Sequence, residues 1–141
     1  LAIVGGWFRP PGTVPTEVTY QESMWVAHHP RSYRLRIERR CECDMRPVTS
    51  TVRDGSVSDA WYETPSGSVA LTGADRPHVM LTIEQLYDYL AEGYRKRFSK
   101  IDIIYDPVLH YPTKVYVDRI ASAVDDEFEL VITVGETHDG G

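Results

Sequence analysis

The sequence predicts an α+β fold in which one helix and three strands are followed by a second helix and three strands, with antiparallel pairing and both helices on one face. Two segments carry apolar residues at helical spacing, and six others alternate between apolar and polar residues or contain runs of β-branched residues. Because the same order of elements occurs twice at a spacing of about 60 residues, the pattern fits a duplicated unit or one meandering sheet.

Length and composition indicate one globular domain. The chain has 141 residues, of which 42% are hydrophobic and 26% are charged, which is enough to build one core without metals or many disulfides. We expect this domain over residues 16–134. Residues 1–15 start with an apolar octet and continue with a Pro- and Gly-rich stretch, which indicates an extended arm. The polar residues 135–141 indicate a C-terminal tail.

The first helix is predicted over residues 16–29, followed by a half-buried strand. Thr19 and Glu22 stand three residues apart, as in a capping box, and Pro30 ends the segment. From Ser32 on, apolar and charged side chains alternate, so one side of this strand faces solvent. The apolar series is Tyr33, Leu35, Ile37, Cys41 and Cys43, and the charged series is Arg34, Arg36, Glu38, Arg40 and Glu42.

A hairpin is predicted next. Residues 48–52 and 56–62 are rich in strand-forming residues and enclose the dipeptide Asp54-Gly55, which tolerates the positive φ angles of tight hairpin turns. Residues 64–77 are rich in Pro, Gly, Ser and Thr, so we expect a surface connection there, with a brief extended piece at residues 69–71.

The second helix begins at a capping box formed by Thr82 and Gln85. Its basic residues 95–97 complement the negative end of the helix dipole. This role accounts for the basic run, so no bound anion is needed to explain it. The apolar residues at helical spacing are Ile83, Leu86, Tyr87, Leu90, Tyr94 and Phe98. Three further antiparallel strands are predicted at residues 100–105, 113–118 and 127–134.

Charge and motifs exclude several function classes. The formal net charge is -6, which argues against nucleic acid as a partner because phosphate binding needs clustered basic residues. The chain contains nothing near the roughly 18 consecutive apolar residues of a membrane-spanning helix. Hydrolase motifs and a phosphate-cradling glycine loop are absent from the sequence, so we expect neither enzyme activity nor a cofactor.

A set of short motifs runs along residues 16–134. In order, they are Trp25, Ser32-Tyr33-Arg34, Cys41-Glu42-Cys43, Thr51-Val52-Arg53-Asp54-Gly55, Thr82-Ile83-Glu84-Gln85-Leu86, Ile104-Tyr105-Asp106-Pro107, Tyr111-Pro112-Thr113, Asp118 and Asp125-Asp126-Glu127. In order and spacing this set resembles the bacterial domain of unknown function 6174 family. The resemblance implies an exported protein, periplasmic or at the cell surface and in many cases a lipoprotein, which fits a processed start at Leu1 without Met. It implies no catalytic residues.

Cys41 and Cys43 are the only cysteines of the chain. On a regular strand their Cα atoms lie about 6.5 to 7 Å apart, at the outer edge of disulfide geometry, so a bond between them needs a kinked backbone. In an exported protein two thiols this close tend to oxidise. We therefore expect an intrachain disulfide.

Two alternatives use the same two thiols. In a redox protein, the neighbouring Arg39 and Arg40 would favour the thiolate. In a metal-handling protein, His28 and His29, or His110, would join the thiols around zinc or copper. The spacing of the cysteines is not that of the usual zinc fingers, so neither alternative leads.

An acidic corner offers oxygen ligands of the kind that calcium prefers. Asp118, Asp125, Asp126 and Glu127 fall close together in the sequence, but the twelve-residue calcium loop with its fixed glycine is absent. We favour a solvated turn in which the acids cap a hairpin and pair with Arg119.

Two pairs of adjacent aromatic residues indicate interfaces. Trp7-Phe8 lies in the arm and Trp61-Tyr62 lies at the end of a strand, and exposed aromatic residues often anchor protein contacts. The leading hypothesis is a non-enzymatic exported domain that acts through protein–protein contacts, as an accessory subunit or binding module of a membrane-associated envelope assembly. The alternative is a small redox or metal-handling protein that uses the two cysteines.

Overall fold

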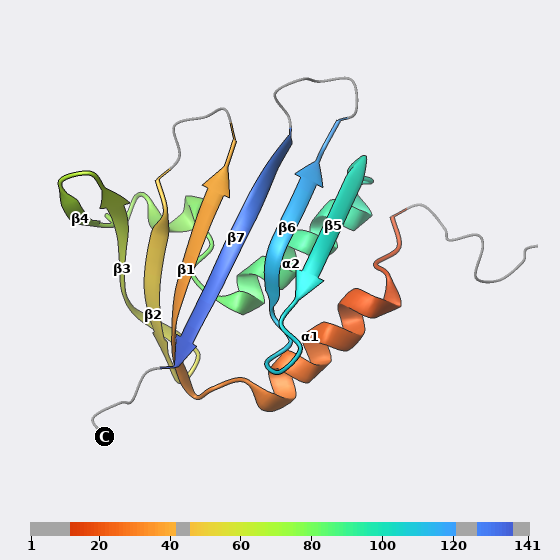
Figure 1. Cartoon of the computed structure of the whole chain (residues 1–141), viewed down its shortest axis with the longest axis horizontal. Coiled ribbons are helices and arrows are strands. Elements are labelled where there is room, and N and C mark those ends of the chain that lie inside the picture. The colour runs from red at the N-terminus through yellow and green to blue at the C-terminus, as the bar shows by residue number, and fades with distance from the viewer. Residues whose placement is uncertain (1–11, 42–45, 121–126, 137–141) are drawn as a thin grey trace, which may run out of the picture.

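The computed structural model describes residues 12–41, 46–120 and 127–136. These residues form two α-helices, one short 3-10 helix and seven strands (Figure 1). In chain order the elements are α1 (Thr16–His28), β1 (Ser32–Arg40), β2 (Val48–Arg53), β3 (Ser56–Thr64), β4 (Gly67–Ala70), η1 (Arg76–His78), α2 (Ile83–Arg95), β5 (Lys100–Tyr105), β6 (Pro112–Asp118) and β7 (Glu127–Glu136).

The seven strands form one antiparallel sheet in the order β4-β3-β2-β1-β7-β6-β5. The first strand, β1, is therefore central and pairs with both β2 and the last strand, β7. The α+β class and the antiparallel pairing are confirmed. The pairing of β1 with β7 joins the two halves of the chain into one sheet rather than two.

The predicted order of elements is wrong in one place, because the surface connection after β3 contains the fourth strand of the first half. Thr64 pairs with Gly67 across a tight turn, and the Thr64 hydroxyl donates to the Gly67 carbonyl at 2.6 Å. All four residues of β4 are exposed. An exposed edge strand needs only backbone pairing, so it leaves no alternation of apolar and polar residues in the sequence.

The hairpin between β2 and β3 is confirmed. Asp54 and Gly55 both have positive φ angles, 52° and 82°, as a type I′ turn requires, and Arg53 pairs with Ser56.

The two helix starts differ in how they are capped. Thr82 caps α2 as predicted, since its hydroxyl accepts a hydrogen bond from the Gln85 N–H at 3.1 Å. The capping box predicted at Thr19 is wrong. Helix α1 starts earlier, after Pro15, whose carbonyl accepts from the N–H groups of Val18 and Thr19.

Helix α2 ends in a Schellman motif. Arg97 has a φ of 60°, its N–H donates to the Tyr94 carbonyl, and the Phe98 N–H donates to the Gly93 carbonyl at 3.0 Å. Phe98 therefore lies beyond the helix although its spacing placed it inside. A Cβ on Gly93 would lie 2.7 Å from Cδ2 of Phe98, so only glycine lets this ring fold back onto the helix.

Both helices contribute to one hydrophobic core on the same face of the sheet (Figure 1). Val18 and Trp25 come from α1, and Leu86 and Leu90 come from α2. The inward residues of the central and C-terminal strands complete this core: Tyr33, Leu35, Ile37, Val52, Val115, Val117, Phe128, Leu130 and Ile132. The opposite face of the sheet lies uncovered by either helix.

Candidate functional site

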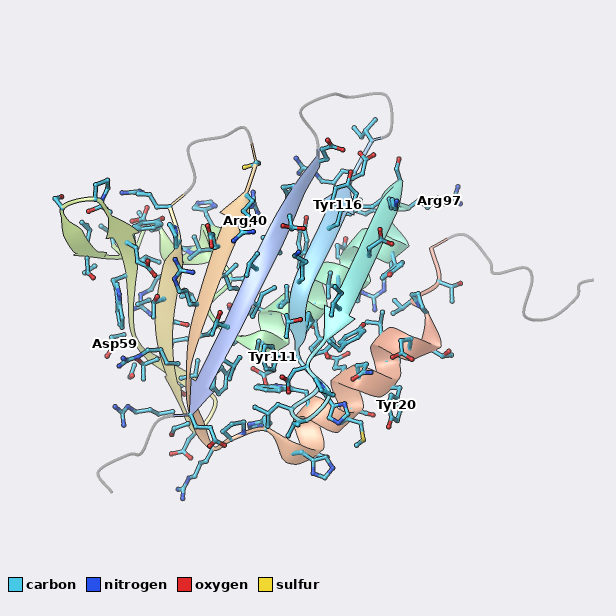
Figure 2. All side chains as sticks on the ribbon, in the orientation of Figure 1. Tyr20, Arg40, Asp59, Arg97, Tyr111 and Tyr116 are labelled. Atoms are coloured by element: carbon cyan, nitrogen blue, oxygen red, sulfur yellow. The ribbon has the colours of Figure 1, made fainter. Side chains whose placement is uncertain are left out.

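The uncovered side of the sheet, called the outer face below, carries charged and polar side chains. It consists of Arg34, Arg36, Glu38 and Arg40 of β1 and of the residues in register with them on the neighbouring strands. Figure 2 labels Arg40 near the end of β1 and Tyr116 on β6. The predicted solvent-facing side of β1 is confirmed.

Arg36 forms the closest ion pair of the outer face. Its Nε atom lies 2.6 Å from Oε2 of Glu63 on β3, and its Nη2 atom lies 3.1 Å from Oε1, so the contact is bidentate. The Thr49 hydroxyl donates to the same carboxylate at 3.2 Å. The hydrogen bond from Arg36 holds the pKa of Glu63 below its ordinary value, and Glu63 in turn raises the pKa of Arg36.

The ion pairs continue across the sheet from β3 to β6. Glu38 lies 3.5 Å from Arg36 and 3.6 Å from Arg40. Arg40 lies 3.8 Å from Glu129 of β7, and Glu129 lies 3.6 Å from Lys114 of β6. Single exposed pairs contribute little stability. Their linkage nevertheless neutralises most of the local charge and holds long side chains in a defined arrangement.

Two aromatic rings stand among these charges. The Arg34 guanidinium lies 5.5 Å from the centre of the Trp61 ring, and the Lys100 ammonium lies 5.8 Å from the centre of the Tyr116 ring. Tyr116, labelled in Figure 2, donates its hydroxyl to Glu127, and this hydrogen bond raises the pKa of Tyr116 to about 12. Aromatic and arginine side chains are the ones most often found at the centre of protein interfaces.

The structure separates the predicted aromatic pair Trp61-Tyr62. Trp61 is in register with Thr49 on the outer face, whereas Tyr62 lies on the opposite side against a small apolar cluster and under Arg46, at 3.9 Å. Successive residues of a strand point to opposite faces, so the two rings cannot form one anchor. The other predicted pair, Trp7 and Phe8, lies outside the described residues.

Cys41 lies far from the predicted partners His28 and His29. Cys41 follows β1 and packs against the main core, whereas Cys43 lies outside the described residues, so the disulfide stays a prediction. His28 and His29 precede β1, roughly 30 Å away along the strand. The Nδ1 atom of His29 lies 2.7 Å from the Pro30 carbonyl oxygen. The described residues contain no group of three or more potential metal ligands.

His110 lies at the opposite end of the sheet from Cys41 (Figure 1). Its Nδ1 atom lies 2.8 Å from Oε1 of Gln21 on α1, at the turn between β5 and β6. That turn starts at Asp106, whose carboxylate accepts from the N–H groups of Val108 and Leu109, as a turn-initiating aspartate does.

Part of the acidic corner is described. Asp118 and Glu127 are cross-strand partners in β6 and β7, and the Glu127 carboxylate accepts the hydrogen bond from Tyr116. Asp125 and Asp126 lie outside the described residues. The calcium site therefore stays an untested alternative to a solvated turn.

A buried hydrogen-bond cluster went unnoticed in the sequence. Oε2 of Glu84 on α2 accepts from Nε1 of Trp25 on α1 at 2.7 Å, and the Tyr33 hydroxyl lies 3.4 Å from Oε1. The Ile83 N–H donates to the same hydroxyl, and burial raises the pKa of Tyr33. The Trp25 ring meets Tyr33 and Tyr111 edge to face. Trp25, Tyr33, Glu84 and Tyr111 all belong to the motifs of the resemblance, and here they tie both helices to the sheet.

Within the residues that the structure describes, neither helix has the length and apolar composition to cross a membrane. The model of one protein family, described as a family of unknown function (DUF6174), matches residues 17–136. The search of curated proteins and the search of solved structures find no match.

Proposed function

The chain belongs to the family of unknown function DUF6174, and we propose that it is a non-enzymatic exported domain that binds another protein through the outer face of its sheet. Its role is that of an accessory subunit or binding module in an envelope-associated assembly. The observation that carries this proposal is the contrast between the two sides of the sheet: both helices cover one side, and an ordered array of charges with embedded aromatic rings lies open on the other.

The size of the outer face supports one protein partner. Seven strands spaced about 4.8 Å apart span roughly 29 Å, and the six strands other than the four-residue β4 have six to ten residues and are about 20 to 33 Å long. The resulting area is of the order of the roughly 800 Å² that each partner contributes to a standard interface. A single domain can therefore cover this surface.

The charge pattern supports a protein rather than a polyanion. On the outer face Glu38 stands between Arg36 and Arg40 along β1, and both arginines are also paired with carboxylates of other strands. Nucleic acids and anionic lipid surfaces require an excess of positive charge, which this face does not provide. A protein with its own mixed charges can match it, and Trp61 with Arg34 supplies an aromatic contact.

Site-specific photo-crosslinking in the native host tests this function. A photoreactive residue replaces Thr133, at the exposed centre of the outer face, or Ala27, exposed on α1. We expect a discrete cross-linked partner from position 133 and none from position 27. Trp61→Ala should weaken that product, while the folded state is checked by circular dichroism.

Three results would count against the proposal. Equal products from both positions, or none from position 133, would exclude the outer face. Loss of the biological phenotype in Cys41→Ser with the cross-linked product intact would favour the redox or metal-handling alternative. Loss of the product on deletion of residues 1–15 alone, with Trp61→Ala unaffected, would transfer the contact to the arm.

A further inference from the structure

A second candidate site lies on the helix-covered side of the sheet. A cavity of about 180 Å³ opens where β1 ends and β2 and β7 begin, between these strands, the segment after η1 and Tyr89 of α2. Its wall contains the inward residues Ile37 and Leu130, which are buried, together with Val48, Val79 and Met80. This part of the cavity is therefore apolar.

Three basic side chains complete the wall. Arg39, Arg46 and His78 line the cavity, and the described residues that line it include no carboxylate. Arg46 and His78 are exposed, whereas Arg39 is half-buried. The apolar residues form the inner part of the site, and the basic groups gather toward its solvent-facing part.

The two guanidiniums rest on aromatic rings instead of carboxylates. Arg39 lies 4.4 Å from the centre of the Phe128 ring, and Arg46 lies 3.9 Å from the centre of the Tyr62 ring. Among the described residues neither one takes part in an ion pair, in contrast to Arg36 and Arg40 on the outer side.

Burial also lowers the pKa of Arg39, with Arg119 acting in the same direction and Tyr89 against it. The positive charge at this site is partly desolvated and lies beside a second positive charge. A carboxylate placed here would gain charge-assisted hydrogen bonds from guanidiniums that ring stacking has already oriented.

We propose that this cavity binds a small carboxylate with an apolar body, the carboxylate lying between Arg39 and Arg46 and the body against Ile37, Val48 and Leu130. The volume of the cavity limits the size of the apolar part of the ligand. An apolar cavity of about 150 Å³ in another protein holds benzene, so one aromatic ring or a short acyl chain fits here. This inference is independent of the outer face and holds for the isolated chain.

Benzoate is the probe that tests it, by titration of the purified chain followed in two-dimensional 1H–15N NMR spectra. We expect saturable shifts of the backbone amides of Val79, Met80 and Tyr89, with a Kd of about 1 mM or below. Benzamide carries the ring without the charge, and acetate carries the charge without the ring. Both should bind at least about tenfold more weakly.

Three variants test whether binding depends on the two guanidiniums of the cavity or only on the overall positive charge of the chain. Arg46→Gln, at an exposed position, and Arg39→Gln should each weaken benzoate binding by about tenfold or more, and the dispersion of the same spectra reports whether each variant is folded. Arg95→Gln, on the exposed end of α2, removes an equal charge away from the cavity and should leave binding unchanged.

The proposal fails if benzoate produces no saturable shift at ten times the expected Kd. It also fails if benzamide binds as tightly as benzoate, or if Arg95→Gln weakens binding as much as Arg46→Gln does. Because the protein partner plays no part in this titration, none of these results contradicts the outer-face proposal.

Discussion

Strand β1 carries arginines on both sides, and their contacts differ between the two sides. On the outer face, Arg36 and Arg40 lie in ion pairs with carboxylates from neighbouring strands. On the inner side, Arg39 lies against the ring of Phe128 beside an apolar cavity. The same residue type thus forms a neutralised surface array in one region and a charged cavity wall in the other.

This difference follows from what surrounds each side chain. Outside, solvent screens the charges, and many carboxylates are within reach, so pairing is easy and contributes little stability. On the inner side, Arg39 is half-buried beside the apolar wall of the cavity, so its charge is screened less than the charges of the outer face and interacts more strongly with an anion that enters. The stability of the fold therefore comes mainly from the inner side.

The largest expected effect compares truncations on the two sides. Leu90→Ala, fully buried on α2, should lower the free energy of unfolding by about 2 to 5 kcal/mol, because it removes apolar contacts and leaves a cavity. Thr133→Ala on the outer face should change it by less than about 0.5 kcal/mol. Urea denaturation followed by circular dichroism measures both. Similar losses from the two variants would show that the outer face contributes to the core.

A smaller effect is expected for the ion pair of Arg36 and Glu63. A double-mutant cycle with Arg36→Gln and Glu63→Gln should give a coupling of about 0.5 to 1 kcal/mol at pH 7, reduced at high salt. Folding lowers the pKa of Glu63 below its ordinary 4.5, so this stabilisation is complete above pH 4.5 and is lost as the pH falls through the folded-state pKa. The cycle repeated at about pH 3 should show a smaller coupling. An unchanged value in acid would contradict the assignment.

The smallest expected effect is an increase in stability. Glu22 of α1 faces Asp88 and Glu84 of α2, and its pKa is raised, mainly by burial and then by these two acids, against a lowering effect of Arg95. Folding therefore favours its protonated form, and the charged form destabilises the protein above the folded-state pKa. Glu22→Gln should increase stability at pH 7 by less than about 0.5 kcal/mol, allowing for solvent screening, and should have no effect below pH 4.5.

Glu63→Gln is the matched comparison for this last prediction, since it should destabilise the protein at pH 7. Thermal denaturation of both variants across the acid range measures the two signs. A loss of stability in both at pH 7 would mean that Glu22 forms a favourable contact rather than an unfavourable one.

Elements with strong side-chain patterns were predictable. The alternation from Ser32 on, the dipeptide Asp54-Gly55 and the capping pair Thr82 and Gln85 all appear in the structure as predicted. Each of these features depends on residues that lie close together in the sequence. The start of α1 at residue 16 was predicted, but its cap was not, because the carbonyl of Pro15 accepts the first N–H groups and the Thr19 side chain does not. Strand β4 was expected only as a brief extended piece at residues 69–71, because an exposed edge strand leaves no alternation of side chains.

The candidate sites were less predictable. Trp61 was singled out, but the pairing that brings Arg36 to Glu63 joins residues far apart in the chain. The inward position of Arg39 could have been read from the phase of Tyr33, Leu35 and Ile37, since all four stand at odd positions of one strand.

By itself, the sequence determined the class of the fold, the two sides of the strand that starts at Ser32 and the family, because these depend on local periodicity and on short motifs. The tertiary structure alone decided that β1 and β7 pair at the centre of one sheet. It also brought Arg39, Arg46 and His78 around one cavity. Contacts of this kind depend on how distant segments pack, and local side-chain patterns carry no information about that packing.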